Sequence, residues 1–346
     1  MLEAPKDRVE RQAGHHRFMT SADRTRGRPG GRAPGSPGPA PRRTCLTVPG
    51  SSERFLAKAI GLAADEVILD LEDSVAPGAK KQARELVGAA LGADWPREPG
   101  QRLLAIRINA ITSPWAYRDV IEIIERAGAR LDAVVLPKVT GPGPVVWLDV
   151  LLSQVELAAG LPPGRIRIEA QIEDAAGLAA ADQIAGASPR LAALVFGPAD
   201  FMASLGMRSL RIGAQPDGYT GGDAFHYARL RILVAARAAG LQAIDGPYAA
   251  IGDTAGLTAA ASSVAALGYD GKWVVHPDQI DPVNAAFSPS QEEYDRAERI
   301  LAAYEHATSV RQRGAVMLDG EMIDEASRKL ALVVAGRGRA AGMTRS

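Results

Sequence analysis

The chain has 346 residues, and its 40 Lys and Arg residues balance 40 Asp and Glu residues, so the formal net charge is zero. This balance gives no argument for a nucleic-acid or membrane partner, and no apolar run approaches the roughly 20 residues of a membrane span. A single cysteine, Cys45, excludes an intramolecular disulfide framework, so we expect a buried, inert thiol in a cytoplasmic protein.

The first 43 residues differ in composition from the rest, with ten Lys and Arg residues against four acids. The stretch RGRPGGRAPGSPGPAPRR is rich in Pro and Gly and cannot bury a core, so residues 1–42 are predicted to be a disordered basic leader. It has no apolar segment of the secretory type. One alternative is a mitochondrial transit peptide, although the Pro and Gly content argues against its amphipathic helix. A second alternative is that Met19 is the true start. The folded part is expected to begin near Arg43.

Eight short apolar runs follow, and each of them ends in polar or charged residues. Alanine-rich, helix-like segments separate these runs, which occupy residues 44–50, 67–73, 103–109, 133–138, 166–173, 191–200, 242–246 and 272–277. Eight buried strands alternating with helices predict a (β/α)8 TIM barrel over residues 43–287, with a C-terminal helical extension over 288–346. Catalytic groups of such barrels lie at the C-terminal strand ends. The first candidates are therefore Glu72, Asp73, Arg107, Asn109, Lys138, Glu173, Asp200, Asp245 and His276.

The first run leads into a helix that Ser51 or Ser52 can cap and that carries Arg54 and Lys58. A helix N-terminus beside two cations can bind an anion. On these residues alone, an ordinary capped helix with solvated charges is the favoured interpretation.

The second and third runs bring opposite charges together. Asp70, Glu72 and Asp73 end the second run, and three acids there require cations, either a metal or Arg and Lys side chains. Arg107 and Asn109 share one face of the third run. The arginine suits a bidentate grip on a carboxylate, or it neutralises the acids of the second run, and the two interpretations are compatible.

The fifth and sixth runs carry the best metal ligands. Glu169, Gln171 and Glu173 share a face at period two, and the deepest of them, Glu169, needs a partner inside the barrel. Asp200 follows a turn at Gly197 that can aim it over the barrel mouth. Two carboxylates with room for water predict Mg²⁺ at Glu173 and Asp200, and the sequence has no His and Cys cluster of the zinc type.

His276 stands at the end of the eighth run. A lone histidine in such a position is more often a hydrogen-bonded structural residue than a catalytic base. Beyond it, a helix is predicted from Pro289 to Tyr304, with Ser288 as its cap, and another over residues 322–334. This extension can act as a lid, reach a neighbouring subunit or simply pack on the barrel.

The motifs TCLTVPGSSERFLAKA, VILDLEDSVAP, IRIN, VVLPKV, IEAQIED, LVFGPADF and GYDGKWVVHPDQI occur in this order. Over residues 43–335 the chain resembles the citrate lyase β-subunit and malyl-CoA lyase group of the HpcH/HpaI aldolase superfamily. The resemblance implies a (β/α)8 barrel that uses Mg²⁺ and makes or breaks a C–C bond beside a thioester. It also implies a homotrimer or homohexamer.

Carried over motif by motif, the resemblance implies that Glu173 of QIED and Asp200 of GPAD bind the metal. Glu72 and Asp73 of LED match acids that hold the water ligands of that metal. Arg107 of RIN matches the residue that grips the 2-keto acid.

Three further positions follow from the resemblance. Arg54 and Lys58 match positions near the CoA phosphates, and Asp324 of GEMIDEAS matches an aspartate that enters the active site of a neighbouring subunit. The chain departs from its relatives at Asp174, where they often carry Thr or Ser, and in the loop over residues 207–225. These departures affect the identity of the substrate.

The expected function is a Mg²⁺-dependent lyase that cleaves or forms the C–C bond of a 3-hydroxyacyl-CoA such as malyl-CoA, β-methylmalyl-CoA or citramalyl-CoA. Its partners are then a CoA thioester and a 2-keto acid. Arg107 holds the keto acid, and Asp324 gives a proton to the enolate carbon or removes it in the condensing direction. The alternatives are a citrate lyase β-subunit acting on a carrier-protein thioester, a malyl-CoA thioesterase and a catalytically silent subunit.

Overall fold

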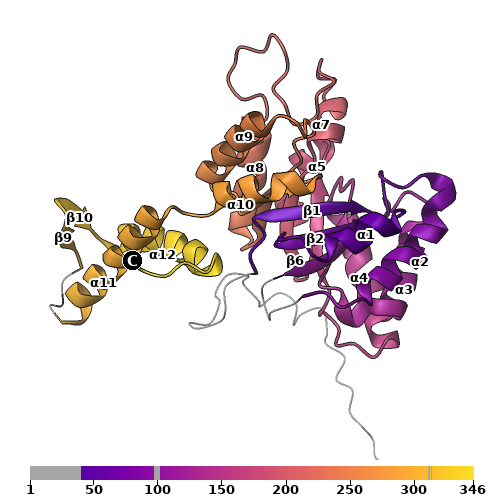
Figure 1. Ribbon diagram of the computed structural model, residues 1–346, viewed down its shortest axis with the longest axis horizontal. Coiled ribbons are helices and arrows are strands. Elements are labelled where there is room, and N and C mark those ends of the chain that lie inside the picture. Colours follow the sequence, from indigo (N-terminus) through magenta and orange to yellow (C-terminus); the bar gives the residue numbers. More distant parts are fainter. Residues whose placement is uncertain (1–39, 97–101, 311, 313) are drawn as a thin grey trace, which may run out of the picture. The chain divides into compact units, whose positions relative to one another are not determined.

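The computed structural model describes residues 40–96, 102–310, 312 and 314–346, and Figure 1 follows its elements in chain order. Within these residues eight parallel strands form a closed barrel in the order β1 to β8, with β1 paired to β8. The strands are β1 (Thr44–Pro49), β2 (Glu66–Asp70), β3 (Leu103–Arg107), β4 (Ala133–Leu136), β5 (Arg167–Ile172), β6 (Leu191–Phe196), β7 (Gln242–Asp245) and β8 (Gly271–Val274). The predicted TIM barrel is confirmed.

Helices connect successive strands, as a parallel barrel requires. They are α1 (Glu53–Ala59), α2 (Lys80–Leu91), α3 (Ala116–Ala127), α4 (Pro142–Ala158), α5 (Ala175–Ala179), α6 (Ala181–Ala185), α7 (Pro198–Ser204), α8 (His226–Ala238), α9 (Thr254–Leu267) and α10 (Ile280–Phe287). Within the described ranges, short 3₁₀ helices occur as η2 (Pro77–Ala79), η3 (Gly128–Arg130) and η4 (Pro277–Gln279).

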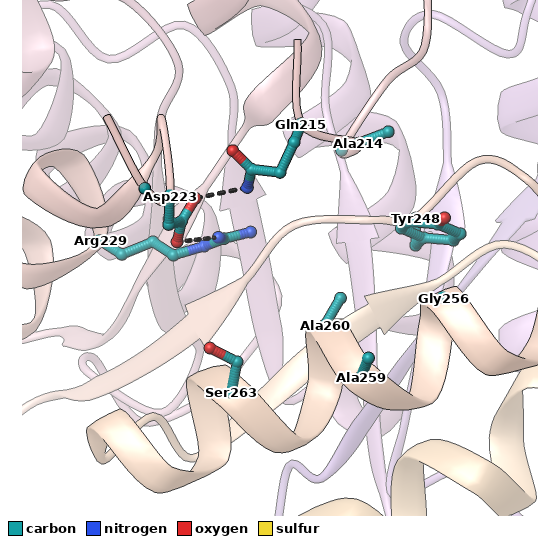
Figure 2. Close-up of a pocket in the computed structure, with 11 residues that line it drawn as sticks. Ala214, Gln215, Asp223, Arg229, Tyr248, Gly256, Ala259, Ala260 and Ser263 are labelled. Atoms are coloured by element: carbon teal, nitrogen blue, oxygen red, sulfur yellow. Dashed lines mark hydrogen bonds and ion pairs between the residues drawn. The ribbon is translucent and has the colours of Figure 1, made fainter. Parts of the chain in front are cut away.

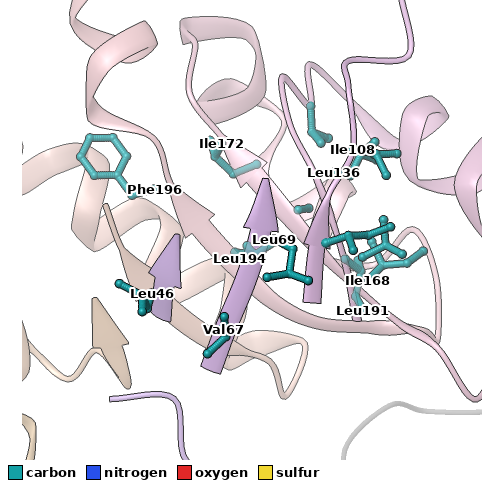
Figure 3. Close-up of a cluster of buried hydrophobic side chains, with 14 of the residues drawn as sticks. Leu46, Val67, Leu69, Ile108, Leu136, Ile168, Ile172, Leu191, Leu194 and Phe196 are labelled. Atoms are coloured by element: carbon teal, nitrogen blue, oxygen red, sulfur yellow. The ribbon is translucent and has the colours of Figure 1, made fainter. Parts of the chain in front are cut away.

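Alternation along each strand separates two apolar cores. Val67 and Leu69 of β2 belong to the large cluster that includes buried side chains of the surrounding helices, and Figure 3 shows part of it. Between them, Ile68 belongs to a smaller cluster that holds only strand residues. This inner cluster contains several alanines together with the large Trp273, so small and large side chains share the barrel interior.

A buried ionic cluster lies at the N-terminal ends of the strands. The Arg42 guanidinium is 3.0 Å from a carboxylate oxygen of Glu169 and 3.5 Å from one of Glu66, and it also donates to Gln242. The expected partner of Glu169 is thus Arg42. Arg42 was assigned to the leader, but its side chain is buried in the barrel, so the described fold begins before this residue. Residues 1–39 of the predicted leader lie outside the described residues.

Cys45 of β1 is also buried beside this cluster. Burial raises the pKa of its thiol, and the neighbouring acids raise it further. A thiol with a raised pKa is a poor nucleophile, which agrees with the inert role expected for this cysteine.

The C-terminal extension contains α11 (Gln291–Ser309), a hairpin of β9 (Val316–Leu318) and β10 (Glu321–Ile323), and α12 (Glu325–Ala340). Helix α11 begins two residues later than predicted, because Ser290 and not Ser288 is its cap and forms a capping box with Glu293. The predicted start of the last helix was also wrong, since Met322 lies in β10.

The two long helices of the extension pack on each other through Tyr294, Ala297, Ala331 and Ala335. Arg337 of α12 donates to the backbone oxygens of Gly268 and Tyr269. None of the helices in the described ranges is long and apolar enough to cross a membrane.

Candidate active site

The end of β2 and the end of β3 meet in a buried ion pair. Asp70 and Arg107 are neighbours in the strand register, and Arg107 donates from Nε and Nη2 to the two oxygens of Asp70 at 2.6 and 2.7 Å. Asp70 is fully buried. Burial by itself raises the pKa of this carboxyl, but the Arg107 guanidinium, together with hydrogen bonds from Ser74 and the Glu72 backbone, holds the pKa below its usual value.

Arg107 also reaches the acids that follow β2. Its Nη1 is 3.0 Å from Oε2 of Glu72 and 3.9 Å from Oδ2 of Asp73. The guanidinium carbon lies 5.4 Å from the ring centroid of Trp273, which is within range of a cation–π contact. Arg107 therefore neutralises the acids of the second strand and its loop, as one of the two interpretations expected. Its grip on a substrate carboxylate stays a prediction.

Lys138, two residues beyond β4, connects the remaining carboxylates. Its Nζ is 2.9 Å from Oε1 of Glu72, 3.3 Å from Oδ1 of Asp73 and 3.5 Å from Oδ2 of Asp200. Its backbone N–H donates to Oε1 of Glu173 at 2.6 Å. The backbone of Lys138 has a φ of 54°, a left-handed conformation that non-glycine residues adopt at a cost. This conformation places both nitrogens of Lys138 within one cluster of acids.

Glu173 is held from two further sides. Its Oε2 accepts a hydrogen bond from Nε2 of Gln171 at 2.6 Å. A Cβ on Gly197 would lie 2.5 Å from Cβ of Glu173, so only glycine fits where the chain leaves β6. Burial and the charge of Glu72, with a smaller contribution from Asp200, raise the pKa of Glu173 to about 8. Burial also raises the pKa of Glu72.

The donor set suits a hard divalent cation. Glu72, Asp73, Glu173 and Asp200 offer only carboxylate oxygens, the ligands that Mg²⁺ prefers. Two buried oxygens, Oε2 of Glu72 and Oδ2 of Asp200, accept no hydrogen bond. In the part of the chain that the structure describes, no three His, Cys, Asp or Glu side chains are arranged as a metal site. The ammonium of Lys138 lies among these oxygens, and the residues present fit Mg²⁺ in chemistry.

Three of the strand-end candidates, Asp245, Asn109 and His276, form hydrogen bonds to residues outside this cluster. Asp245 faces the surrounding helices, where it accepts hydrogen bonds from Lys272 and from Arg229 of α8. Asn109 is buried and donates to Asp119 of α3 at 2.6 Å. These two side chains hold helices on the barrel. Asp245 was therefore wrongly placed in the mouth, whereas a place of Asn109 there stays a prediction.

His276 has a local role that agrees with the structural interpretation. It is the N-cap of η4, and its Nδ1 accepts a hydrogen bond from the backbone N–H of Asp278 at 3.2 Å.

The predicted CoA contacts lie on exposed surface. Ser52 caps α1, and both Arg54 and Lys58 are exposed on that helix. The guanidinium carbon of Arg54 is 4.8 Å from the ring centroid of Phe55. The two cations are thus accessible to a ligand, and their role in binding CoA stays a prediction.

Asp324 is the N-cap of α12. It accepts hydrogen bonds from the backbone N–H of Ser327 at 3.0 Å and from its hydroxyl at 3.1 Å. These bonds hold the pKa of Asp324 below its usual value. In the described part of this single chain, the hydrogen bonds of Asp324 are thus to its own helix, and its entry into a neighbouring active site stays a prediction.

The two departures from the expected family pattern have structural roles. Asp174 is the N-cap of α5 and accepts a hydrogen bond from the backbone N–H of Gly177 at 2.6 Å. The long loop between α7 and α8 borders a cavity of about 360 Å³, shown in Figure 2. There Asp223 accepts hydrogen bonds from Gln215 of the loop and from Arg229 of α8. The loop is thereby tied to the barrel wall.

Sequence reasoning underestimated three residues of the site. Asp70 was treated only as one of three acids, although its register with Arg107 on the next strand was the available signal. Lys138 was a strand-end candidate without a role, and no periodicity reveals its positive φ. Trp273 lies inside the barrel under Arg107, and sequence gives no sign of that contact.

A closed (β/α)8 barrel that gathers carboxylates, an arginine and a lysine at the C-terminal strand ends has the architecture of a barrel enzyme. The HpcH/HpaI aldolase/citrate lyase family model matches residues 43–277. The chain belongs to this family, and it is a carbon–carbon lyase.

Named relatives fall into two groups. An L-malyl-CoA/β-methylmalyl-CoA lyase of Cereibacter sphaeroides (strain ATCC 17025 / ATH 2.4.3) is 41% identical over 308 residues, which cover 86% of this chain and 95% of the relative. The citrate lyase subunit beta of Escherichia coli (strain K12) is 36% identical over 285 residues, covering 82% and 88%.

Solved structures agree with the family. The protein CitE from Mycobacterium tuberculosis, in complex with magnesium, acetoacetate and coenzyme A, has a TM-score of 0.66 and 32% identity, covering 88% of this chain and 99% of that one. A citrate lyase from Burkholderia xenovorans LB400 has a TM-score of 0.73 and 25% identity, covering 89% and 94%.

Proposed function

We propose that the protein is a Mg²⁺-dependent lyase that cleaves or forms the C–C bond of a 3-hydroxyacyl-CoA such as malyl-CoA, β-methylmalyl-CoA or citramalyl-CoA. The products of cleavage are an acyl-CoA and a 2-keto acid. The observation that carries the proposal is the cluster of Glu72, Asp73, Glu173 and Asp200 around Lys138, beside the buried guanidinium of Arg107. Similarity to malyl-CoA lyases over most of the chain supports the substrate class.

Glu173 and Asp200 would hold Mg²⁺, and Glu72 and Asp73 would hold its water ligands. When bound, the ion supplies Lewis acidity, which makes the substrate hydroxyl more acidic and offsets the negative charge of the reaction. Gln171 and the Lys138 backbone N–H orient Glu173 through one hydrogen bond to each of its oxygens. These bonds fix the ligand in the way that outer partners of metal ligands do.

Arg107 would hold the carboxylate of the keto acid. Its Nε and Nη2 are engaged by Asp70, which fixes the plane of the guanidinium. Nη1 lies 3.0 Å from Oε2 of Glu72, on the side of the guanidinium away from Asp70. This nitrogen would therefore donate a hydrogen bond to the substrate carboxylate. A preorganised cation of this kind stabilises charge that develops during C–C cleavage.

Asp324 would give the proton that ends the cleavage reaction on the enolate carbon, or remove it in the condensing direction. We place this aspartate in the active site of a neighbouring copy, which requires an oligomer, and the family resemblance implies a homotrimer or homohexamer. Arg54 and Lys58 would bind the CoA phosphates, and the protein would act in the cytoplasm. The exposure of Arg54 and Lys58 supports their contact with CoA, and the exposed surface of the α11–α12 extension supports contact with a neighbouring copy.

A parallel product assay tests the proposal. Purified protein is mixed with malyl-CoA and Mg²⁺, glyoxylate is trapped with phenylhydrazine, and free thiol is measured with a thiol reagent. Glyoxylate without free CoA is the expected result. Free CoA without glyoxylate would instead identify a malyl-CoA thioesterase.

The second candidate is a citrate lyase β-subunit that acts on a carrier-protein thioester, which the 36% identity to the Escherichia coli subunit favours. The C-terminal extension that carries Asp324 instead favours a stand-alone lyase that acts on free CoA esters. A pull-down with an acyl carrier protein, run beside the same assay with citramalyl-CoA, separates the two candidates. Retention of the carrier protein without cleavage of either CoA ester would favour the β-subunit.

A further inference from the structure

The ammonium of Lys138 occupies a point that three carboxylates share. Its nearest oxygens belong to Glu72 and Asp73, in the loop after β2, and to Asp200, in the first turn of α7. Lys138 itself follows β4, so the contact draws together segments from three parts of the barrel rim. One positive charge thus links three acids that would otherwise repel one another.

This point coincides with the donor set that fits a divalent cation. Oδ2 of Asp200 and Oε2 of Glu72 are buried and accept no hydrogen bond, although Lys138 Nζ and Arg107 lie within ion-pair distance of them. A divalent cation held by Asp200, with its water ligands on Glu72 and Asp73, would share these three acids with the ammonium, and like charges a few ångströms apart repel strongly. The ammonium and the metal therefore compete for one place.

The two nitrogens of Lys138 differ in freedom. The backbone N–H is fixed on Glu173 by a 2.6 Å hydrogen bond in a left-handed conformation. The side chain is 40% exposed, and a flexible stem of four carbons connects its Nζ to that backbone. The ammonium can thus leave the acids toward solvent while the backbone continues to hold Glu173.

We infer that Lys138 is a built-in counter-ion that occupies the metal position in the metal-free protein and swings out when the metal binds. This inference rests on the proposed Mg²⁺ function and adds a regulation of the same site. The lysine keeps the carboxylates assembled before the metal arrives, and it lowers the apparent affinity for the metal. If the lysine-bridged state outnumbers the open state by about ten to one, the apparent dissociation constant is about tenfold weaker than that of the open site.

Mn²⁺ binding to the full-length protein tests this inference without any substrate. Free Mn²⁺ is followed by electron paramagnetic resonance during titration of the wild type, Lys138→Met and Lys138→Arg. Met has a similar length and no charge, and all variants keep the backbone N–H. We expect Lys138→Met to bind Mn²⁺ about tenfold or more tightly than the wild type, and Lys138→Arg to bind no more tightly than the wild type.

Thermal unfolding supplies a second readout. In EDTA, Lys138→Met should melt at a lower temperature than the wild type because its carboxylates lack their cation. Added Mn²⁺ should raise its melting temperature by more than that of the wild type. Lys81→Met, which removes an exposed lysine of α2, is the matched control for a general change of charge and should change neither property.

The outcomes separate the inference from the proposed function. Equal Mn²⁺ affinity of wild type and Lys138→Met would overturn the counter-ion role. Weaker Mn²⁺ binding by a Lys138→Met protein that keeps the circular dichroism of the wild type would overturn it as well. Either result would leave the lyase proposal standing. Binding by Lys138→Met but not by the wild type would support the inference. If neither protein binds Mn²⁺, the inference and the metal-dependent function both fail.

Discussion

Replacing Arg107 with Met tests the buried ion pair at the centre of the site. The substitution removes two hydrogen bonds from Asp70, which is fully buried, and the ion pair with Glu72. A buried charge left without its partner typically costs about 3–5 kcal/mol of stability. We expect a loss of this size, measured as the free energy of unfolding in urea followed by tryptophan fluorescence.

The loss should depend on pH in a direction that the ion pair dictates. In the wild type the pKa of folded Asp70 is held below its usual value by Arg107, so this residue contributes stability above an unfolded pKa of about 3.9 that is lost as pH falls. In Arg107→Met, burial still raises the folded pKa of Asp70, and only the hydrogen bonds from Ser74 and from the backbone of Glu72 remain to oppose it. The stability difference between the two proteins should therefore shrink as the pH falls from 7 toward 4.

A double variant supplies the control. Arg107→Met combined with Asp70→Asn removes both charges, so it should be more stable at pH 7 than Arg107→Met alone. A single-variant loss below about 1 kcal/mol at pH 7 would refute the reasoning, since exposed ion pairs contribute that little. A double variant as unstable as the single one would refute it as well.

Four further predictions concern catalysis, metal binding and stability. Asp324→Ala should lower turnover of malyl-CoA by about 10²–10⁴-fold and leave Mn²⁺ affinity unchanged, whereas near-wild-type turnover would contradict its role as acid and base. The pKa of Glu173 is about 8 in the metal-free protein, so metal binding displaces a proton from this carboxyl. Mn²⁺ affinity should therefore rise from pH 6 to pH 8. An affinity that does not change with pH would be inconsistent with this prediction. The protonated Glu173 contributes stability to the metal-free protein below its unfolded pKa of about 4.3, and this contribution is lost as pH rises through about 8, which unfolding in EDTA can measure. Gly197→Ala should weaken Mn²⁺ binding about 10–100-fold in titrations because its methyl group would displace Glu173, and unchanged binding in a folded variant would show that the ligand can shift without loss.

The barrel was predictable because its signals are local. Each strand is a short apolar run between Ala-rich helices, and this pattern requires no knowledge of distant contacts. The last helices were harder, since two serines precede α11. Ser290 is the cap and forms a capping box with Glu293. Gln291 lies at the same spacing from Ser288, so this signal in the sequence does not choose between the two serines.

The site was predictable only in part, because strand-end residues do not all face the mouth. Ile244 belongs to the inner cluster, so alternation turns Asp245 outward, and β7 ends there. Glu72 and Asp73 follow the end of β2, where alternation no longer applies, and their positions depend on Arg107 and Lys138. Those contacts join residues far apart in the chain, which spacing alone does not reveal.

The condensation reaction tests the central claim most directly. Acetyl-CoA and glyoxylate are incubated with the wild type and Mg²⁺, and the CoA esters are identified by mass spectrometry, with pyruvate as a second acceptor and Glu173→Gln as a matched control. The account predicts the mass of malyl-CoA or citramalyl-CoA with the wild type and its loss with Glu173→Gln. A wild-type protein that binds Mn²⁺ but yields no condensed CoA ester with either acceptor would contradict it.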